Sequence, residues 1–485
     1  MILSLAILYV LLAVLLSVTT AGSLVLLLIH LLDHHAPKEP VIPAEWPCVT
    51  VQLPVYNEQY VVERLLDAVA ALDYPVDKLV IQLLDDSTDA TSRLAARKVA
   101  QLRADGLAVQ HIRRADRTGF KAGALQEGMA RSLTPYYAIF DADFVPPPDF
   151  LRVTLSHLLA DDTHGMVQGR WGHLNAQDSP LTAAQALAID GHFVIEQASR
   201  SKGGLLLNFN GTGGVWRADC IHDAGGWRDT TLTEDFDLSY RAQLRGWHMR
   251  TLPDLVVPGE LPTHLLAFKQ QQFRWAKGST QCLLQTIRPL WRSQHTTLPQ
   301  SIMGTLHLCQ YMPYPLILML ALLAPPLLLA GVFAELPLAF MLFSGIVPPL
   351  VYAVSQQAIY SDGWRRMIAF PALVVFGTGI AINNTVALLS ALVGSPGEFQ
   401  RTPKSGTANH ATYTASVDAT TLLEVCGAVY IGWGAWLAVQ HAPHAAPYLA
   451  LSAFSYATTA LWSLWESWQT YRANQRPPVS STKLN

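Results

Sequence analysis

Residues 233–275 begin with Thr-Glu-Asp (Thr233–Asp235) and end with Gln-Gln-Phe-Arg-Trp (Gln271–Trp275). A short non-helical connection, Glu260–Pro262, lies between these two groups. Directly after residue 275 the sequence becomes basic and amphipathic, and then strongly apolar. The segment therefore links a pair of carboxylates to an Arg-Trp pair at the junction between a predicted soluble domain and a predicted membrane-embedded part.

The composition is that of a membrane protein. The 485-residue chain is 51% hydrophobic and 14% charged, whereas soluble domains carry about a quarter charged residues. The first 32 residues contain no Asp, Glu, Lys or Arg. We expect one soluble domain of roughly 220 residues flanked by membrane segments. The net charge of -3 argues against a nucleic-acid binder, and five scattered cysteines argue against structural zinc or a disulfide framework.

Strand-like and helix-like segments alternate in the first part of the soluble domain. Short apolar, β-branched runs predict strands at 48–54, 78–84, 108–112 and 136–140, and helical spacing is found at 58–72, 89–103 and 121–132. Ser87 or Thr88 is the expected cap of the second helix. This alternation predicts a parallel sheet covered on both faces, with ligands at the carboxyl ends of its strands. The acids expected along that rim are Asp85, Asp86, Asp141 and Asp143.

Asp141 and Asp143 are separated by one residue at a predicted strand end. Such a pair suits Mg²⁺ or Mn²⁺, which keep few protein ligands and complete their shell with water and phosphate. The alternative is a pair of ordinary polar loop residues or helix caps, and Asp86 on the same rim favours the metal. Glycine-rich dinucleotide and Walker loops are missing, but Lys121 at a glycine-rich helix start would favour phosphate. The alternative is a solvated lysine in a glycine turn.

Together these motifs resemble the processive, membrane-integrated family-2 glycosyltransferases: the cellulose synthases and, more closely, the cellulose-synthase-like glucomannan and mannan synthases of plants and their bacterial relatives. The match follows the order of the family from about residue 48 to residue 285. The matching stretches are Pro54–Glu58, Asp85–Ser87, Gly119–Ala124, Phe140–Asp143, Val167–Trp171, Asn208–Gly214, Thr233–Asp235 and Gln271–Trp275.

The resemblance implies an α/β GT-A (Rossmann-like) domain at residues 48–265, cytosolic and inserted between transmembrane helices. It implies a UDP- or GDP-sugar donor and inverting transfer of a hexose to the non-reducing end of a β-linked glycan. The enzyme would be processive, with membrane translocation, in polysaccharide biosynthesis such as that of cell walls. Two alternatives remain: transfer of one sugar to a lipid such as diacylglycerol or ceramide, and an export component without catalysis.

The resemblance also assigns roles by position. Asp235 would be the general base, and Asp141 and Asp143 would bind Mg²⁺ or Mn²⁺. The donor would contact Tyr56, Glu58, Asp86, Lys121, Asp141, Gln271 and Arg274. The acceptor would contact Glu234, Trp275 and Gly213, within a glycine-rich stretch, 208–214, whose backbone can approach a ligand closely.

Both ends of the opening segment have simpler explanations. Glu234 and Asp235 could form a helix amino terminus capped by Thr233, where two acids favour the helix dipole. Arg274 and Trp275 could be anchors at the membrane interface, a depth that both residue types favour.

Hydropathy and charge predict the membrane topology. A retained helix over residues 1–34 is followed by a linker at 35–47, and further spans are expected at 305–332, 338–357, 421–440 and 446–467. Residues 266–300 read as interfacial amphipathic helices. If residues 367–393 lie on the cytosolic interface and do not cross the membrane, five spans place all basic loops on the cytosolic side. The segment 301–472 then forms the membrane part, with a cytosolic tail at 473–485.

The loop 395–410 resembles a gating loop of bacterial cellulose synthases through Phe399, Thr402 and Lys404, with Arg401 in place of a valine. Such a loop would close over the donor diphosphate. We expect no regulatory barrel after the last span. The plasma (inner) membrane of a bacterium is the expected location, with the catalytic domain cytosolic.

Overall fold

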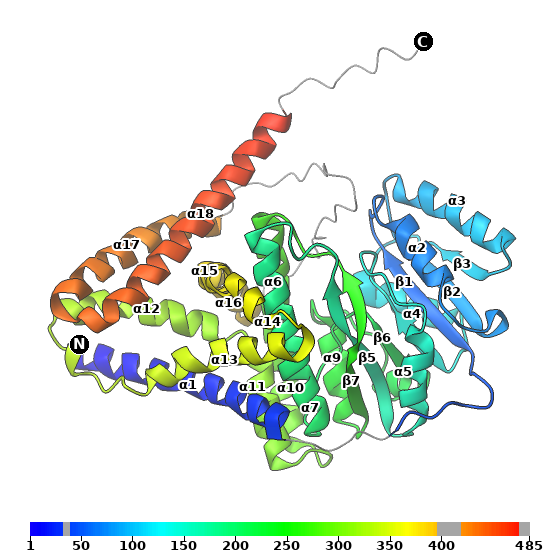
Figure 1. The fold of residues 1–485 in the computed structure, drawn as a ribbon, viewed down its shortest axis with the longest axis horizontal. Coiled ribbons are helices and arrows are strands. Elements are labelled where there is room, and N and C mark those ends of the chain that lie inside the picture. The colour runs from blue at the N-terminus through cyan, green and yellow to red at the C-terminus, as the bar shows by residue number, and fades with distance from the viewer. Residues whose placement is uncertain (33–38, 395–418, 475–485) are drawn as a thin grey trace, which may run out of the picture.

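The computed structural model describes residues 1–32, 39–394 and 419–474. Figure 1 shows a sheet with its helices on one side of the molecule and a group of long helices on the other. The chain starts in the long helices, crosses to the sheet domain and returns. The soluble domain is thus placed between membrane-type segments of sequence, as predicted.

Seven strands form one sheet in the order β3-β2-β1-β4-β6-β5-β7. The strands are β1 (Val49–Val55), β2 (Leu79–Asp85), β3 (Ala108–Ile112), β4 (Tyr136–Ile139), β5 (His164–His173), β6 (Gly214–Arg217) and β7 (His248–Gly259). The four predicted strands are β1 to β4, and their parallel pairing is confirmed.

The prediction of a wholly parallel sheet is wrong, because β6 runs antiparallel to both β4 and β5. The reason lies in the path of the chain before this strand. Residues 203–213 carry the chain back to the ligand-binding edge of the sheet, where Asn210 and Gly211 line a cavity. Because β6 starts at that edge, at Gly214, it must run away from it, whereas β4 and β5 run toward it.

The helices of the soluble domain cover both faces of the sheet. They are α2 (Val62–Ala70), α3 (Thr91–Ala104), α4 (Phe120–Ala130), α5 (Phe150–Leu159), α6 (Pro180–Gly191), α7 (Ala198–Lys202), α8 (Ala218–Asp223) and α9 (Glu234–Gln243). The three predicted helices correspond to α2, α3 and α4. The predicted cap of α3 is wrong: its N-cap is Ala90, and the Asp89 carboxylate instead accepts a hydrogen bond from the Thr91 N–H.

Burial explains why the early strands were recognisable. Val49, Val51 and Leu53 are fully buried in the cluster on one face of the sheet, whereas Tyr137 and Ile139 belong to the cluster on the other face. Strands that are buried on both faces read as continuous apolar runs.

The other half is called the membrane half after the spans predicted in it. It contains α1 (Ile2–Leu32), α10 (Leu265–Arg292), α11 (Leu298–Leu308), α12 (Pro313–Leu329), α13 (Met341–Ile359), α14 (Gly363–Arg366), α15 (Phe370–Gly379), α16 (Ala381–Leu392), α17 (Ala419–His441) and α18 (Ala446–Asn474). Among the described residues, α1, α13 and α17 are long and apolar enough to cross a membrane. The number rises to five if α11–α12, bent by 61°, and α14–α16, bent by 42°, each form one span.

These candidates overlap the predicted spans only in part. The predicted span 446–467 lies in α18, which is not among them. Figure 1 shows α15 and α16 nearly end-on, whereas α1, α12 and α13 extend across the view. The different direction of residues 367–393 agrees with the prediction that they lie on the interface, which stays a prediction.

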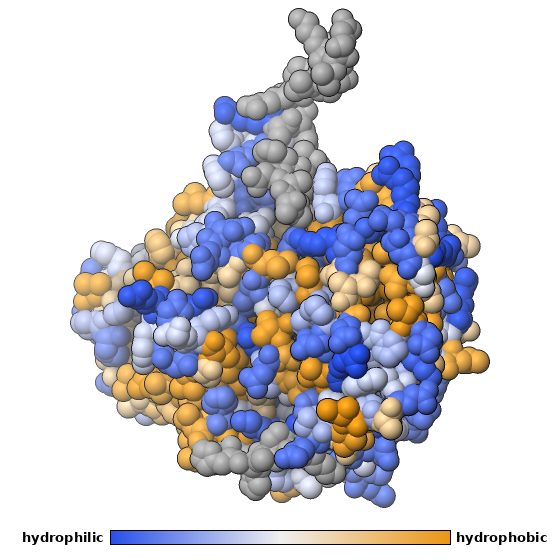
Figure 2. All heavy atoms as spheres, turned by 45° about the vertical axis from the view of Figure 1, so that its right-hand side comes forward, coloured by the Kyte–Doolittle hydropathy of each residue, from blue (hydrophilic) through white to orange (hydrophobic). Residues whose placement is uncertain are grey.

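Large apolar side chains are exposed on the long helices. Examples are Leu3, Leu11, Leu15, Leu422, Val429, Trp436, Phe454, Leu461 and Trp465. By contrast, the face that Figure 2 brings forward, which includes the sheet domain, carries a mixture of hydrophilic and hydrophobic side chains. A helix surface of this kind suits a lipid environment.

Helix α10 joins the two halves. The Glu466 carboxylate on α18 accepts hydrogen bonds from the N–H groups of Leu265 and Leu266, at 2.8 and 3.0 Å, in the first turn of α10. One turn later, the Lys269 ammonium lies 2.8 Å from the Glu424 carboxylate of α17, and both side chains are almost fully buried. Two carboxylates from the last two helices therefore hold the start of α10.

The buried pair gives a stability prediction. Glu424→Gln removes the carboxylate charge that lies 2.8 Å from the buried Lys269 ammonium, and loss of one partner of such a pair costs about 3–5 kcal/mol. The change is measured as the free energy of unfolding of the purified protein in detergent.

Glu127→Gln is the matched control, because Glu127 and Arg131 form an exposed pair one turn apart on α4. Its effect should stay below about 0.5 kcal/mol. Equal losses for the two variants would contradict a structural role for the buried pair.

Candidate active site

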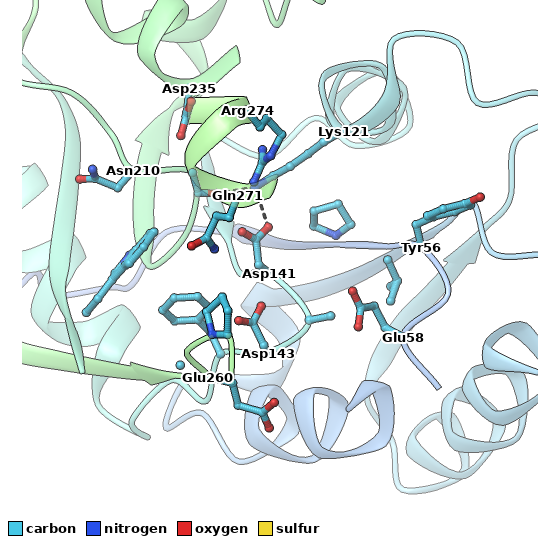
Figure 3. A pocket seen from close by; sticks show the side chains of 18 of the residues that line it. Tyr56, Glu58, Lys121, Asp141, Asp143, Asn210, Asp235, Glu260, Gln271 and Arg274 are labelled. Atoms are coloured by element: carbon cyan, nitrogen blue, oxygen red, sulfur yellow. Dashed lines mark hydrogen bonds and ion pairs between the residues drawn. The ribbon is translucent and has the colours of Figure 1, made fainter. Parts of the chain in front are cut away.

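A cavity of about 180 Å³ lies at the carboxyl ends of β1, β2 and β4 (Figure 3). Of the predicted site residues in the described part of the chain, all but Gly213 line it. They are Tyr56, Glu58, Asp86, Lys121, Asp141, Asp143, Glu234, Asp235, Gln271, Arg274 and Trp275. Residues far apart in sequence are thus brought to one edge of the sheet, as the strand-end rule predicts.

Asp141 and Asp143 lie in the middle of the cavity, between Tyr56 and Glu58 on one side and Asp235 on the other. The Lys121 ammonium is 2.5 Å from Asp141 Oδ1 and also donates to the Gly211 carbonyl. Two carboxylates provide the oxygen ligands that Mg²⁺ and Mn²⁺ prefer.

The described residues contain no group of three or more His, Cys, Asp or Glu side chains that could hold a metal ion. A cation held by Asp141 and Asp143 would therefore complete its shell with ligand phosphate and water. The donor set fits such a cation.

Asp86 is held by an arginine that the sequence reasoning missed. The Arg114 guanidinium binds both Asp86 carboxylate oxygens, at 3.0 and 2.5 Å. Nearby, the Arg117 guanidinium lies 3.4 Å from the centre of the Tyr56 ring and lines the cavity. The available signal was the run of arginines directly after the third predicted strand.

Asp85, which was also expected on this rim, faces inward. It is 1% exposed, and its carboxylate is bonded to the His111 ring and the Ser87 N–H. Burial would raise the pKa of Asp85, but hydrogen bonds led by that from His111 lower it to about 2. Asp85 therefore supports the rim, and Asp86 faces the cavity.

Asp235 stands in the first turn of α9, and Phe236 N–H donates to its Oδ1 at 2.8 Å. Burial, followed by the neighbouring Glu234 carboxylate, raises the pKa of Asp235 to about 7, while Lys121 and Arg274 oppose the shift. A carboxylate with a pKa near neutrality suits a general base. The predicted Thr233 cap is absent: Thr233 occupies the N-cap position without a side-chain capping bond.

The glycine-rich loop before β6 comes close to Asp235. Gly211 has φ of +85°, and a Cβ at this position would lie 2.9 Å from Asp235 Oδ2. The loop therefore needs glycine here, both for its backbone conformation and for space.

A second cavity, of about 720 Å³, lies between the sheet domain and α1, α10, α12, α13 and α15. Both cavities are lined by Trp171, Ile189, Asn210, Thr233, Asp235, Gln271 and Trp275. Asp235 and Trp275 therefore lie on the boundary between the two. Trp171 was part of a recognised motif but had no assigned role, and the structure places it at this boundary.

Gly213 is the exception among the predicted residues. It lines neither cavity, because its N–H and carbonyl pair with Ile139 and Gly169 in the sheet. Asn208 and Asn210 of the same loop line the larger cavity instead. Phe399, Thr402 and Lys404, predicted for the gating loop, lie outside the described residues.

The predicted donor and acceptor contacts at Gln271, Arg274 and Trp275 lie on one face of α10. Gln271, Arg274 and Trp275 are spaced by three and four residues, so their side chains share a side of the helix. All three line the smaller cavity, and Gln271 and Trp275 also line the larger one.

Comparison with known proteins agrees with this geometry. Residues 47–278 match the family model described as "Glycosyltransferase like family 2". This segment is similar to members of that family, and the predicted GT-A-like α/β fold is confirmed.

The chain is similar to plant mannosyltransferases. It is 41% identical over 255 residues to glucomannan 4-beta-mannosyltransferase 2 of Arabidopsis thaliana, covering 52% of this chain and 48% of the relative. It is 40% identical over 261 residues to glucomannan 4-beta-mannosyltransferase 1 of Oryza sativa subsp. japonica, covering 53% and 50%. The chain thus spans about half the length of these curated relatives.

Among solved structures, the chain resembles a mannosyltransferase from Pyrobaculum calidifontis in complex with GDP-Man and Mn²⁺. The TM-score is 0.52 at 22% identity, covering 78% of this chain and all of that one. The two proteins share the fold.

Proposed function

We propose that this chain is an inverting hexosyltransferase that extends a β-linked glycan from a nucleotide sugar, with mannose as the first candidate sugar. The glycan would leave through the larger cavity as it grows. One observation carries the proposal: Asp235 and Trp275 line both the cavity at the strand ends and the cavity that continues among the membrane-type helices.

In this proposal the smaller cavity binds the donor. Tyr56, Glu58 and Asp86 contact the nucleoside end, and Asp141 and Asp143 hold Mg²⁺ or Mn²⁺ at the diphosphate. The metal would neutralise charge on the leaving diphosphate. The leaving diphosphate would also be surrounded by two cations, Lys121 and Arg274, and by the amide of Gln271 as a hydrogen-bond donor. The names of the plant relatives support mannose as the sugar, and the GDP-Man and Mn²⁺ in the related structure support a GDP-sugar with a divalent metal.

Asp235 would take the proton from the acceptor hydroxyl. Inverting transfer needs one base on the acceptor side and a stabilised leaving group, unlike the retaining scheme with two carboxylates. Glu234 lies beside the base and contributes to its raised pKa. Trp275 offers an aromatic face for the acceptor sugar, and its bulk limits the entry of water.

The lining of the larger cavity supports a glycan acceptor over a lipid. Hydroxyl and amide groups from several helices face it: Thr19, Thr20, Ser23, Gln272, Ser279, Gln310 and Ser344. Tyr311, Tyr314 and Tyr352 add aromatic surface. Polar and aromatic groups together suit sugar rings. Leu16, Leu26 and Ile317 also line the cavity and would accept the chain of a diacylglycerol or ceramide, so single-sugar transfer to a lipid remains the second candidate.

The helices α1, α13 and α17 indicate a membrane protein. A cytosolic catalytic domain follows from the proposed nucleotide-sugar donor. The named relatives are plant enzymes, so the bacterial inner membrane stays a prediction from the sequence alone.

A donor panel tests the proposal. Purified protein is incubated with labelled GDP-mannose, UDP-glucose or UDP-N-acetylglucosamine, with Mn²⁺ or Mg²⁺ or with EDTA, and products are sized. We expect metal-dependent glycan longer than one added sugar, with mannose preferred. If the product is a lipid carrying a single sugar, the polymer hypothesis is wrong and single-sugar transfer to a lipid takes its place. If Asp235→Asn turns over donor as fast as wild type, Asp235 is not the general base.

The pKa of Asp235 gives a pH prediction. Because the base acts in its ionised form, kcat/KM should fall tenfold per pH unit below about pH 7. Glu234→Gln removes a neighbouring negative charge that raises this pKa, so its acid limb should move to lower pH, whatever its maximal rate. A limb that stays near pH 7 in Glu234→Gln would contradict the assignment of this limb to Asp235.

A further inference from the structure

The larger cavity has a second acidic position, away from Asp235. A π-helix, His192–Gln197, interrupts the rod formed by α6 and α7, and π-helical turns occur frequently at functional sites. Two of its side chains, His192 and Glu196, line the cavity. Each side chain is about a quarter exposed, at 24% and 27%.

Hydrogen bonds determine which nitrogen of the His192 ring donates and which accepts. Gln197 Nε2 donates to Asn210 Oδ1 at 2.7 Å, which turns the Asn210 amide nitrogen toward His192 Nε2, 3.0 Å away. His192 Nε2 therefore accepts, and its Nδ1 donates to Glu196 Oε2 at 2.9 Å. Because Asn210 also lines the donor cavity, this chain of bonds connects Glu196 to the reaction centre.

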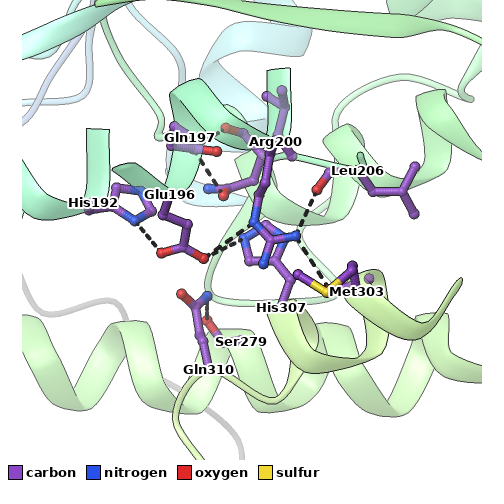
Figure 4. Close-up of polar contacts among 12 residues, drawn as sticks. His192, Glu196, Gln197, Arg200, Leu206, Ser279, Met303, His307 and Gln310 are labelled. Carbon is purple, nitrogen blue, oxygen red and sulfur yellow. Dashed lines mark hydrogen bonds and ion pairs between the residues drawn. The ribbon is translucent and has the colours of Figure 1, made fainter. Parts of the chain in front are cut away.

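The other oxygen of Glu196 faces the buried side chains of Arg200 and His307 (Figure 4). Arg200 Nε lies 3.4 Å from Glu196 Oε1, and the guanidinium is held by the carbonyls of Leu206 and Met303. His307 Nε2 is 4.0 Å from the same oxygen, and its Nδ1 bonds to the Tyr240 hydroxyl of α9 at 2.8 Å.

This surrounding keeps the carboxylate charged. Burial would raise the pKa of Glu196, but the hydrogen bond from His192 and the charge of Arg200 lower it well below its usual range. An ionised carboxylate, fixed in place and partly open to a cavity, is a strong acceptor of hydrogen bonds from hydroxyl groups.

Gln310 completes the arrangement. Figure 4 shows its amide opposite the Glu196 carboxylate, and both residues line the cavity. Gln310 lies in the break between α11 and α12, and its Nε2 donates to Ser279 Oγ of α10 at 3.3 Å. A ligand between Glu196 and Gln310 would therefore meet a charged acceptor from the sheet domain and an amide from the membrane half.

We propose that Glu196, with His192 and Gln310, forms a sugar-binding subsite for the acceptor glycan behind its terminal unit. Glu196 accepts hydrogen bonds from hydroxyls of a hexose that has passed Trp275, and Gln310 bonds the same unit from the other side. The inference rests on the proposed function and deepens its acceptor site. It also gives the acceptor a contact that a lipid with one sugar would not need.

Acceptor kinetics with β-1,4-linked mannohexaose and mannobiose, at saturating GDP-mannose, test the subsite. Glu196→Gln keeps the size of the side chain and removes its charge. We expect the KM for mannohexaose to rise about tenfold, with the KM for GDP-mannose within twofold of wild type. The KM for mannobiose should change less, because it is too short to fill the subsite and the site at Trp275 together.

Gln310→Ala is the second variant, since it leaves the His192–Glu196–Arg200 bonds in place, and the same rise in KM is expected. Gln285→Ala, an exposed glutamine of α10, is the control and should match wild type.

Wild-type acceptor KM in both Glu196→Gln and Gln310→Ala would overturn the subsite and leave the proposed function standing. A decrease in kcat without a rise in the acceptor KM in these two variants would also overturn the subsite. A wild-type protein that transfers no hexose to either oligosaccharide would instead refute the proposed function, and the subsite with it.

Discussion

The arrangement depends on how α10 is held at its start. This helix carries Gln271, Arg274 and Trp275 to the boundary of the two cavities, yet its first turn is fixed by Glu466 of α18 and Glu424 of α17. A charge buried in an apolar surrounding is costly unless it is paired. The Lys269–Glu424 pair and the capped N–H groups therefore have few alternative positions, and α10 is kept in one place relative to the long helices.

That constraint connects the sheet domain with the membrane half. The sheet supplies carboxylates at its strand ends, α9 supplies Asp235, and α10 closes the site from the side of the long helices. The proposed base thus stands where a ligand at the strand ends and a ligand among the helices would meet. In the proposed function, the donor cavity and the cavity through which the glycan leaves share lining residues. Each added sugar therefore enters the exit cavity at the position where it was joined.

Parts of this structure could be predicted from the sequence for definable reasons. Strands β1 to β4 are apolar runs buried on both faces, and acids that follow them must share an edge. Strand β6 has only four residues and no periodicity, so its reversal depends on the preceding loop, which returns to the rim. Arg114 and Glu196 were missed because their roles come from partners distant in sequence or from a π-turn inside an ordinary helical pattern. Gly213 was misplaced because glycines of one loop serve both the sheet and the cavity.

The proposed function requires that transfer and membrane passage meet at Asp235 and Trp275. It is tested most directly with protein reconstituted into sealed vesicles, its catalytic domain outward, and labelled GDP-mannose supplied outside. We expect the labelled glycan to resist an externally added β-mannanase until detergent opens the vesicles. Glycan that is fully digested without detergent would contradict it.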